Sequence, residues 1–198
     1  MNTTSLIVEV LVGGFVTLIW IGLIIIKAYG IDYPDIDAFI VKYKDWSNII
    51  LFSIMAFSYQ LGWVMIHLSY IATNRPIIIP LRKKIFGDKH KNYRTIKNKV
   101  YFNSNSDLMS GIEKDRSVIR LTRTGLLNFI ILAIVLLFYK LWWLAFAAFI
   151  ISMISLMQLR TVYLSLYKKL NDSHSEIMDD VMISNELFDD GRGDNPQL

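Results

Sequence analysis

Four long apolar runs alternate with polar segments along this chain. They cover residues 6–26, 47–71, 121–139 and 141–166, and charged residues are scarce inside them. A helix needs about 20 mostly apolar residues to cross the hydrocarbon core of a bilayer, and each run is close to that length or longer. The pattern therefore predicts an all-α membrane protein with four transmembrane helices.

The third and fourth runs are separated by a short interruption at Lys140, which Trp142 and Trp143 follow closely. A lysine in the middle of a bilayer is costly, whereas tryptophan is common at the membrane interface. We therefore expect two helices joined by a very tight turn, in preference to one uninterrupted helix through both runs.

Basic residues gather in one segment of the chain. Thirteen of its 21 Lys and Arg residues lie between Thr73 and Thr124. Basic residues near helix ends stay on the cytoplasmic side of a membrane, so we predict two hairpins, a basic cytoplasmic loop at 73–120 and both termini in the cytoplasm. The domain organisation is then one transmembrane domain at 1–170 and an acidic cytoplasmic tail at 171–198, with its end disordered.

Apolar residues also recur at helical spacing within the polar segments. Residues 35–43 predict a short amphipathic helix on the outer leaflet, and the segment after Pro80 predicts a second one along the inner headgroups. A further helix begins near Asp107 and runs straight into the third span. Its polar side carries an arginine stripe formed by Arg116, Arg120 and Arg123.

Five polar or ionisable residues fall inside the predicted spans, where each is expensive in hydrocarbon. They are Glu9, His67, Asn128, Gln158 and Arg160. The predicted topology places all five in the cytoplasmic leaflet at similar depth. A Glu9–Arg160 or Glu9–His67 contact would neutralise charge and fix helix packing. The five could form a proton- or ion-responsive cluster, or each could simply extend to the inner headgroups.

Small residues mark places where helices pack closely in lipid. Gly13 and Thr17 share one face of the first span, and Ala148 and Ser152 share one face of the fourth. We expect contacts inside the bundle there, with subunit interfaces as the alternative. Gln60, near the middle of the second span, would hydrogen-bond either another helix or its own copy in a second subunit.

The basic loop admits three kinds of partner. Anionic lipid headgroups are the simplest, with contacts expected at the arginine stripe and at Arg82, Lys83 and Lys84. An acidic cytoplasmic protein, or the acidic tail of a neighbouring subunit, is the second. Nucleic acid is the least favoured, because no recognised binding motif accompanies the basic residues.

Enzymatic chemistry has little support in the sequence. The chain has no cysteine and only three histidines, which excludes disulfides, thiolate nucleophiles and cysteine-based metal sites. It contains no HExxH motif, glycine-rich phosphate loop or nucleophile elbow. We therefore predict no catalytic residues, cofactor or metal site.

One stretch, from LGWVMIHLSY through IEKDRSVIRLTRTGLLNFIIL, has a recognisable pattern of arginines followed by Leu-Asn-Phe. The matching positions are Asp115, Arg116, Ser117, Arg120, Arg123, Leu127, Asn128 and Phe129. The pattern resembles that of a loose family of uncharacterised bacterial four-span membrane proteins, in which an Arg-rich helix leads into the third span. This chain has His67 and Tyr70 where the family carries acidic residues, so the resemblance transfers no charged site and implies no known reaction.

These observations together predict a non-enzymatic, homo-oligomeric module of the bacterial inner membrane. It would act as a membrane effector, or as a membrane sensor or scaffold that recruits a cytoplasmic partner, and anti-phage defence is one setting for such a module. The alternative is a membrane-embedded immunity or assembly factor that binds one partner protein. A small ion channel or transporter subunit is the third possibility.

Overall fold

Helices account for all the regular structure in the described part of the chain. The computed structural model describes residues 3–31, 38, 41–103 and 106–190, and no β-strand occurs among them. The long helices are α1 (Thr3–Tyr29), α3 (Ser47–Thr73), α6 (Ser106–Phe138) and α7 (Trp142–Asp190). The shorter elements are η1 (Lys44–Trp46), η2 (Asn74–Ile78), α4 (Ile79–Phe86), η3 (Gly87–Asn92) and α5 (Tyr93–Asn103).

The four predicted spans coincide with helical segments that are long and apolar enough to cross a membrane. The all-α prediction and its four long apolar helices are therefore confirmed, consistent with a multi-pass membrane protein. The predicted amphipathic helix at 35–43 falls largely outside the described residues.

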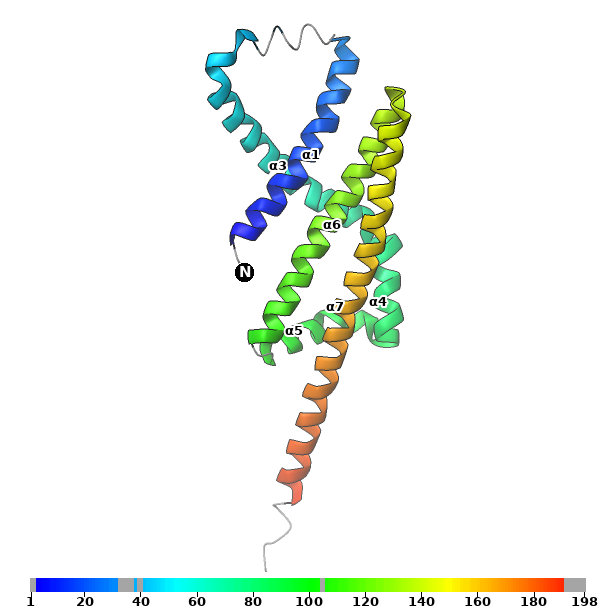
Figure 1. Cartoon of the computed structure of the whole chain (residues 1–198). Helices are drawn as coiled ribbons and strands as arrows, with labels where there is room; N and C mark the ends of the chain where they lie inside the picture. The colour runs from blue at the N-terminus through cyan, green and yellow to red at the C-terminus, as the bar shows by residue number, and fades with distance from the viewer. Residues whose placement is uncertain (1–2, 32–37, 39–40, 104–105, 191–198) are drawn as a thin grey trace, which may run out of the picture.

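Two glycines determine how α1 and α3 cross. Figure 1 shows the two helices crossing and then diverging toward the C-terminal end of α1 and the N-terminal end of α3. A Cβ added to Gly14 would stand 1.6 Å from the carbonyl oxygen of Ser58, and one added to Gly62 would stand 1.9 Å from that of Val10. Because only glycine lets two backbones approach this closely, the crossing point is fixed at this pair.

Helices α6 and α7 form an antiparallel hairpin that reverses at Lys140. This residue adopts the left-handed conformation, with φ of 59°, and the Leu141 amide donates a hydrogen bond of 3.1 Å to the carbonyl of Leu136. The predicted tight turn is confirmed, and a single uninterrupted helix through this region is excluded. α6 also begins at Ser106, so the arginine-striped segment does continue directly into the third span.

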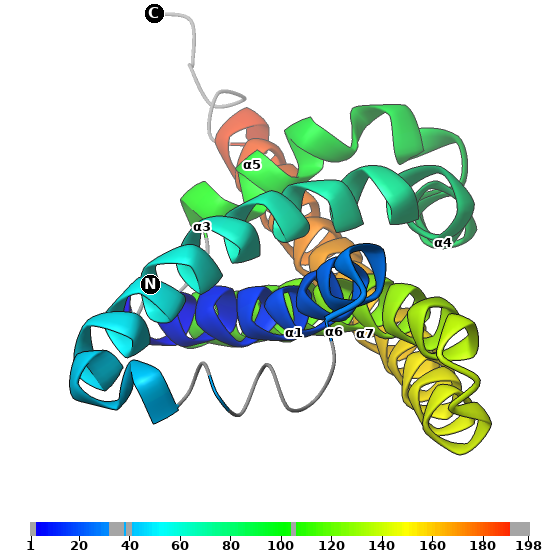
Figure 2. The same ribbon diagram turned by 90° about the horizontal axis from the view of Figure 1, so that it is seen from above.

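Between α3 and α6 the chain wraps around one end of the hairpin. η2 continues α3, Pro80 lies in the first turn of α4, and Gly87, with φ of 51°, ends that helix. α4 and α5 both pack against α7, and Figure 2 shows them with α3 on one side of the α6–α7 hairpin. We call this end of the molecule, formed by residues 74–103, 106–120 and 159–177, the basic head.

The largest buried apolar cluster lies mainly in the basic head. Residues 74–103 contribute Ile78, Phe86, Ile96 and Val100, and the hairpin contributes Ile112, Ile119, Leu126, Leu159, Tyr163, Leu166, Tyr167 and Leu170. Aromatic rings tighten it, since Phe86, Tyr93 and Tyr167 meet edge to face at centroid distances of 5.5 to 5.8 Å. Burying one such side chain stabilises the fold by about 1.5–3 kcal/mol. The head is therefore a packed unit whose apolar core includes residues of both helices of the hairpin.

Candidate functional site

The predicted intramembrane polar residues divide into a buried group and an exposed group. Glu9 and Asn128 are buried on the α1–α6 interface, whereas His67, Gln158 and Arg160 are exposed on α3 and α7. The five residues therefore do not form one cluster. The polar contacts of Glu9, Asn128 and Arg123 lie where α6 meets α1 on one side and α3 on the other.

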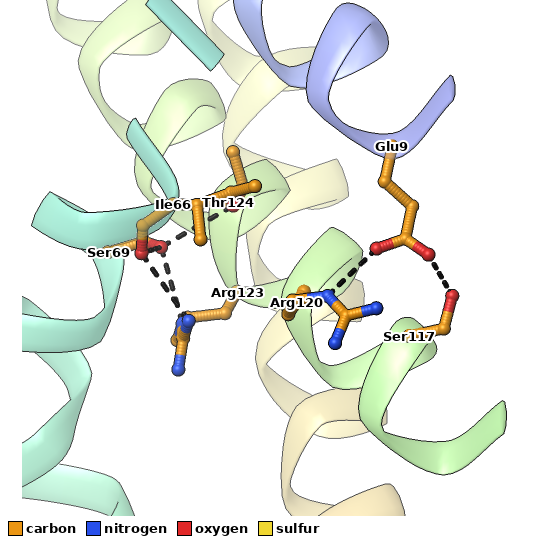
Figure 3. Close-up of polar contacts among 7 residues, drawn as sticks. All are labelled: Glu9, Ile66, Ser69, Ser117, Arg120, Arg123 and Thr124. Atoms are coloured by element: carbon orange, nitrogen blue, oxygen red, sulfur yellow. Dashed lines mark hydrogen bonds and ion pairs between the residues drawn. The ribbon is translucent and has the colours of Figure 1, made fainter. Parts of the chain in front are cut away.

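Glu9 contacts α6. It does not contact Arg160 or His67, which its predicted depth in the membrane had suggested as partners. Arg120 Nε donates to one carboxylate oxygen at 3.0 Å, and the hydroxyl of Ser117 donates to the other (Figure 3). The carboxylate is 7% exposed and the guanidinium side chain 24%. The Glu9–Arg160 and Glu9–His67 contacts are thus corrected to a Glu9–Arg120 ion pair. Arg120 comes from the predicted arginine stripe.

Asn128 joins α1 to α6 two turns further along. Its amide nitrogen donates to the carbonyl of Gly13 at 2.9 Å, while its oxygen accepts from Thr17 and Trp20, both at 3.0 Å. The side chain is 1% exposed, and these three contacts use both ends of its amide. Asn128 is therefore a satisfied interhelical cross-link.

The other side of α6 carries Arg123, which faces α3. Its Nε donates to Ser69 Oγ at 3.3 Å and its Nη2 to the carbonyl of Ile66 at 3.4 Å (Figure 3). Its guanidinium lies 5.1 Å from the ring centre of Tyr70. Arg123 is 7% exposed, and the described residues supply it with no carboxylate partner. A buried arginine held only by neutral groups is an unusual element in a helix bundle.

The predicted helix-packing residues all lie inside the bundle. Gly13 and Thr17 contact α6 through Thr124 and Asn128. Ala148 and Ser152 are 4% and 2% exposed, and Ala148 packs with Ala133 and Leu136 of α6. Of the two interpretations, intra-bundle packing is the one observed.

The basic head places its predicted contact residues in two kinds of surroundings. Arg82 turns toward the aromatic cluster, with its guanidinium 4.2 Å from the ring centre of Tyr93 and its Nε buried without a hydrogen-bond partner in the described part of the chain. Lys83, Lys84 and Arg116 are exposed. The exposed bases are free to meet a lipid or a protein, whereas Arg82 first of all supports the fold of the head.

The electrostatics of α5 reflect this packing. Burial raises the pKa of the Tyr93 hydroxyl, and the nearby Arg82 partly offsets that shift. Burial also lowers the pKa of Lys97, and the positive charges of Arg116 and Arg94 lower it further. Crowded like charges of this kind favour an anionic partner, because such a partner relieves their repulsion.

The remaining features offer no catalytic arrangement. Within the described residues, no three His, Asp or Glu side chains are grouped so as to hold a metal ion. A groove of about 770 Å³ between α6 and α7, near Trp142 and Trp143, is lined by apolar side chains apart from Ser152. Neither feature suggests a reaction.

Several contact residues were not identified from the sequence. Ser117 lies one turn before Arg120, and Trp20 lies one turn after Thr17, so helical spacing places each on the correct face. Gly62 lies four residues after Ser58, and Ser69 lies seven residues after Gly62, along the buried face of α3. Their spacing was the available signal, but it does not reveal which helix they face.

Comparison with known proteins gives no match to a family model, to a curated protein or to a solved structure. The resemblance to bacterial four-span membrane proteins stays a prediction.

Proposed function

We propose that this chain is a non-enzymatic module of the bacterial inner membrane that recruits an acidic protein partner through its basic head. One observation carries this proposal: the head has its own apolar core, and that core joins α4 and α5 to α6 and α7. A segment that served only as a topology signal would need positive charge but no packed core. A folded, basic surface fits a docking role.

The charge balance of the head supports the same conclusion. Residues 74–120 contain twelve Lys and Arg residues against four Asp and Glu residues. An internal ion pair between Lys169 and Asp115, at 2.6 Å, joins α7 to α6 within the head. Most of the basic charge remains exposed, so an acidic partner would bind faster and more specifically there than elsewhere. Under this proposal both termini and the head face the cytoplasm.

A pore is a weaker function for this bundle. The polar groups of Glu9 and Asn128 are used in contacts between helices, so they do not line a path for ions. A membrane-perturbing effector, including one for anti-phage defence, stays a prediction. Measurement of the membrane potential during overexpression tests it, with depolarisation as the supporting result.

Site-specific photocrosslinking in living cells tests the recruitment proposal. A photoreactive amino acid at Lys84, on the head, is compared with one at Lys140, at the opposite end of the hairpin. Both positions are exposed. We expect a discrete protein adduct from position 84 and none from position 140.

Charge reversal then identifies the chemistry of the contact. The double change Lys83→Glu and Lys84→Glu should be introduced with the photoreactive residue moved to exposed Arg94, and should reduce the adduct about tenfold. Lys140→Glu should leave it unchanged. If position 94 gives no protein adduct, or if charge reversal does not weaken it, the recruitment proposal is wrong and lipid contact alone accounts for the charge.

A further inference from the structure

The outer face of α3 carries a stripe of polar residues. Ser53, Gln60 and His67 lie at intervals of seven residues and are all exposed. The buried positions of α3 lie on the opposite face, which packs against α1 and α6; they are Ser58, Gly62, Met65, Ser69 and Thr73. The polar stripe is therefore turned away from the rest of the molecule.

Of the three residues in this stripe, Gln60 is the one whose exposure to lipid costs the most free energy. It lies at the midpoint of α3, and the described residues provide it with no hydrogen-bond partner. Ser53, by contrast, satisfies its hydroxyl by donating to the carbonyl of Ile49 at 2.9 Å. Hydrocarbon tails cannot bond an amide, and lipid headgroups do not reach the middle of a bilayer. An amide at this position therefore requires a protein partner.

The surroundings of Gln60 fit another copy of the same helix. Residues that recur every seven positions form one continuous seam when two helices supercoil. A primary amide is both a donor and an acceptor, so two Gln60 side chains across a symmetry axis satisfy each other. A hollow of about 430 Å³ lies beside it, lined by Ser53, Ala56, Phe57, Tyr59 and Gln60. Within that lining, the small side chains of Ser53 and Ala56 allow a second helix to approach, and the aromatic rings of Phe57 and Tyr59 flank them.

The other small-residue surfaces do not compete for this role, because Gly13, Thr17, Ala148 and Ser152 are used inside the bundle. We propose that two copies of this chain pair in parallel through the Ser53–Gln60–His67 face of α3, with the two Gln60 amides hydrogen-bonded to each other near the bilayer centre. This pairing does not depend on what the basic head recruits.

Cysteine crosslinking tests the face directly, since the natural chain has no cysteine. Ser53→Cys and His67→Cys are each compared with an exposed neighbour one residue away, Phe52→Cys and Leu68→Cys. Neighbours lie at nearly the same depth but are rotated by about 100° around the helix. In native membranes under oxidising conditions, positions 53 and 67 should form disulfide-linked dimers at about ten times the yield of positions 52 and 68.

Substitution of Gln60 tests the amide itself. Gln60→Leu should lower the crosslinking yield at position 53 and weaken the dimer about tenfold in detergent, as measured by light scattering over a dilution series. Gln60→Asn keeps an amide and should retain most of the dimer. Because Gln60 is exposed, neither change should alter the helix content measured by circular dichroism.

Three results would overturn the pairing. The purified protein could be monomeric at every concentration, with no crosslinks in membranes. Adjacent cysteines could crosslink equally, which would indicate random collision. Gln60→Leu could leave the dimer as strong as before, which would show that the amide is not at the interface.

Discussion

The two faces of α6 each carry a buried or partly buried arginine, and the two arginines differ in their contacts. On the α1 face, Arg120 is ion-paired with Glu9 at 3.0 Å. On the α3 face, Arg123 lies three residues later and is more deeply buried. Its contacts are with neutral groups: the Ser69 hydroxyl, the Ile66 carbonyl, the ring of Tyr70 and the hydroxyl of Tyr163 on α7. One helix thus presents a charge-balanced interface to α1 and an unbalanced one to α3.

The difference shows that burial alone does not reveal what an arginine does. Burying a charge is expensive, and a carboxylate in good geometry compensates much of that expense. The α1 face has this compensation, and it also has the cross-link made by Asn128. The α3 face depends instead on weaker, longer hydrogen bonds, between 3.3 and 3.4 Å, from Arg123 and Thr124 to α3. We therefore expect the α1 face to be the stronger interface and the α3 face to tolerate change.

The largest expected effect comes from Gly14→Ala, which acts on both faces because it separates α1 from α3. The new Cβ would overlap the Ser58 carbonyl, so the crossing must open, at about 3 kcal/mol of stability. Gly22→Ala is the matched control, because nothing lies within 4 Å of its added Cβ. Thermal unfolding in detergent should show a large loss for the first variant and none for the second. Equal behaviour would mean that the crossing is not tight.

The next largest effect is expected from Arg120→Gln, which removes the ion pair with Glu9 from the α1 face of α6. Removing one member of a fully buried pair costs about 3–5 kcal/mol, and we expect about 2–3 here because Arg120 is 24% exposed. Glu9→Gln should cost a similar amount. The double variant should recover much of the loss, and the double-mutant cycle from unfolding measurements quantifies the coupling. Simple additivity of the two losses would argue against the pair.

Asn128→Leu removes the second contact of the α1 face. The amide donates to the Gly13 carbonyl, which Thr17 also reaches at 2.8 Å. The backbone oxygen therefore keeps a partner, and we expect a loss of about 1–2 kcal/mol. Trp20 should register the change, because its indole nitrogen loses the Asn128 oxygen as its acceptor. We expect a shift in tryptophan fluorescence emission together with the loss of stability. Comparison with the Trp20→Phe variant assigns that shift to Trp20. An unchanged spectrum would contradict the contact.

Arg123→Met should have the smallest effect and gives the sharpest contrast with Arg120. Methionine replaces an unbalanced buried charge by an apolar chain of similar length, and Ser69 still donates to the Ile66 carbonyl at 2.9 Å. We expect a change within about 1 kcal/mol in either direction. Arg120→Met is the control and should lose as much as Arg120→Gln. A loss of more than about 3 kcal/mol at Arg123 would show that the α3 face holds a charge partner after all.

Much of the fold was predictable from periodicity. Apolar runs identified the four long helices, and the interruption at Lys140 identified the hairpin turn. Pro80 marked the first turn of α4, and the continuous spacing after Asp107 showed that α6 is one helix. These features depend on local sequence, which is why the sequence alone reveals them.

The pairing of Glu9 was not predictable in the same way. Arg120 and Arg160 both lie near the basic ends of the predicted spans 121–139 and 141–166, so depth alone does not separate them. The choice depends on how α1 rotates against α6, and that rotation follows from the crossing at Gly14 and Gly62 and from the contact of Gly13 with Thr124. Such contacts between helices are set by three-dimensional packing and leave no periodic signal in one chain.

Helix α7 gives the molecule a lever. It runs without interruption from Trp142 to Asp190, well past the head (Figure 1). At 1.5 Å per residue, the part beyond residue 177, where the head ends, extends about 20 Å. A tilt of about 10° at that point would move the far end sideways by about 3 Å, as follows from the same rise per residue. A rotation of the helix within the head would thus become a displacement of its far end.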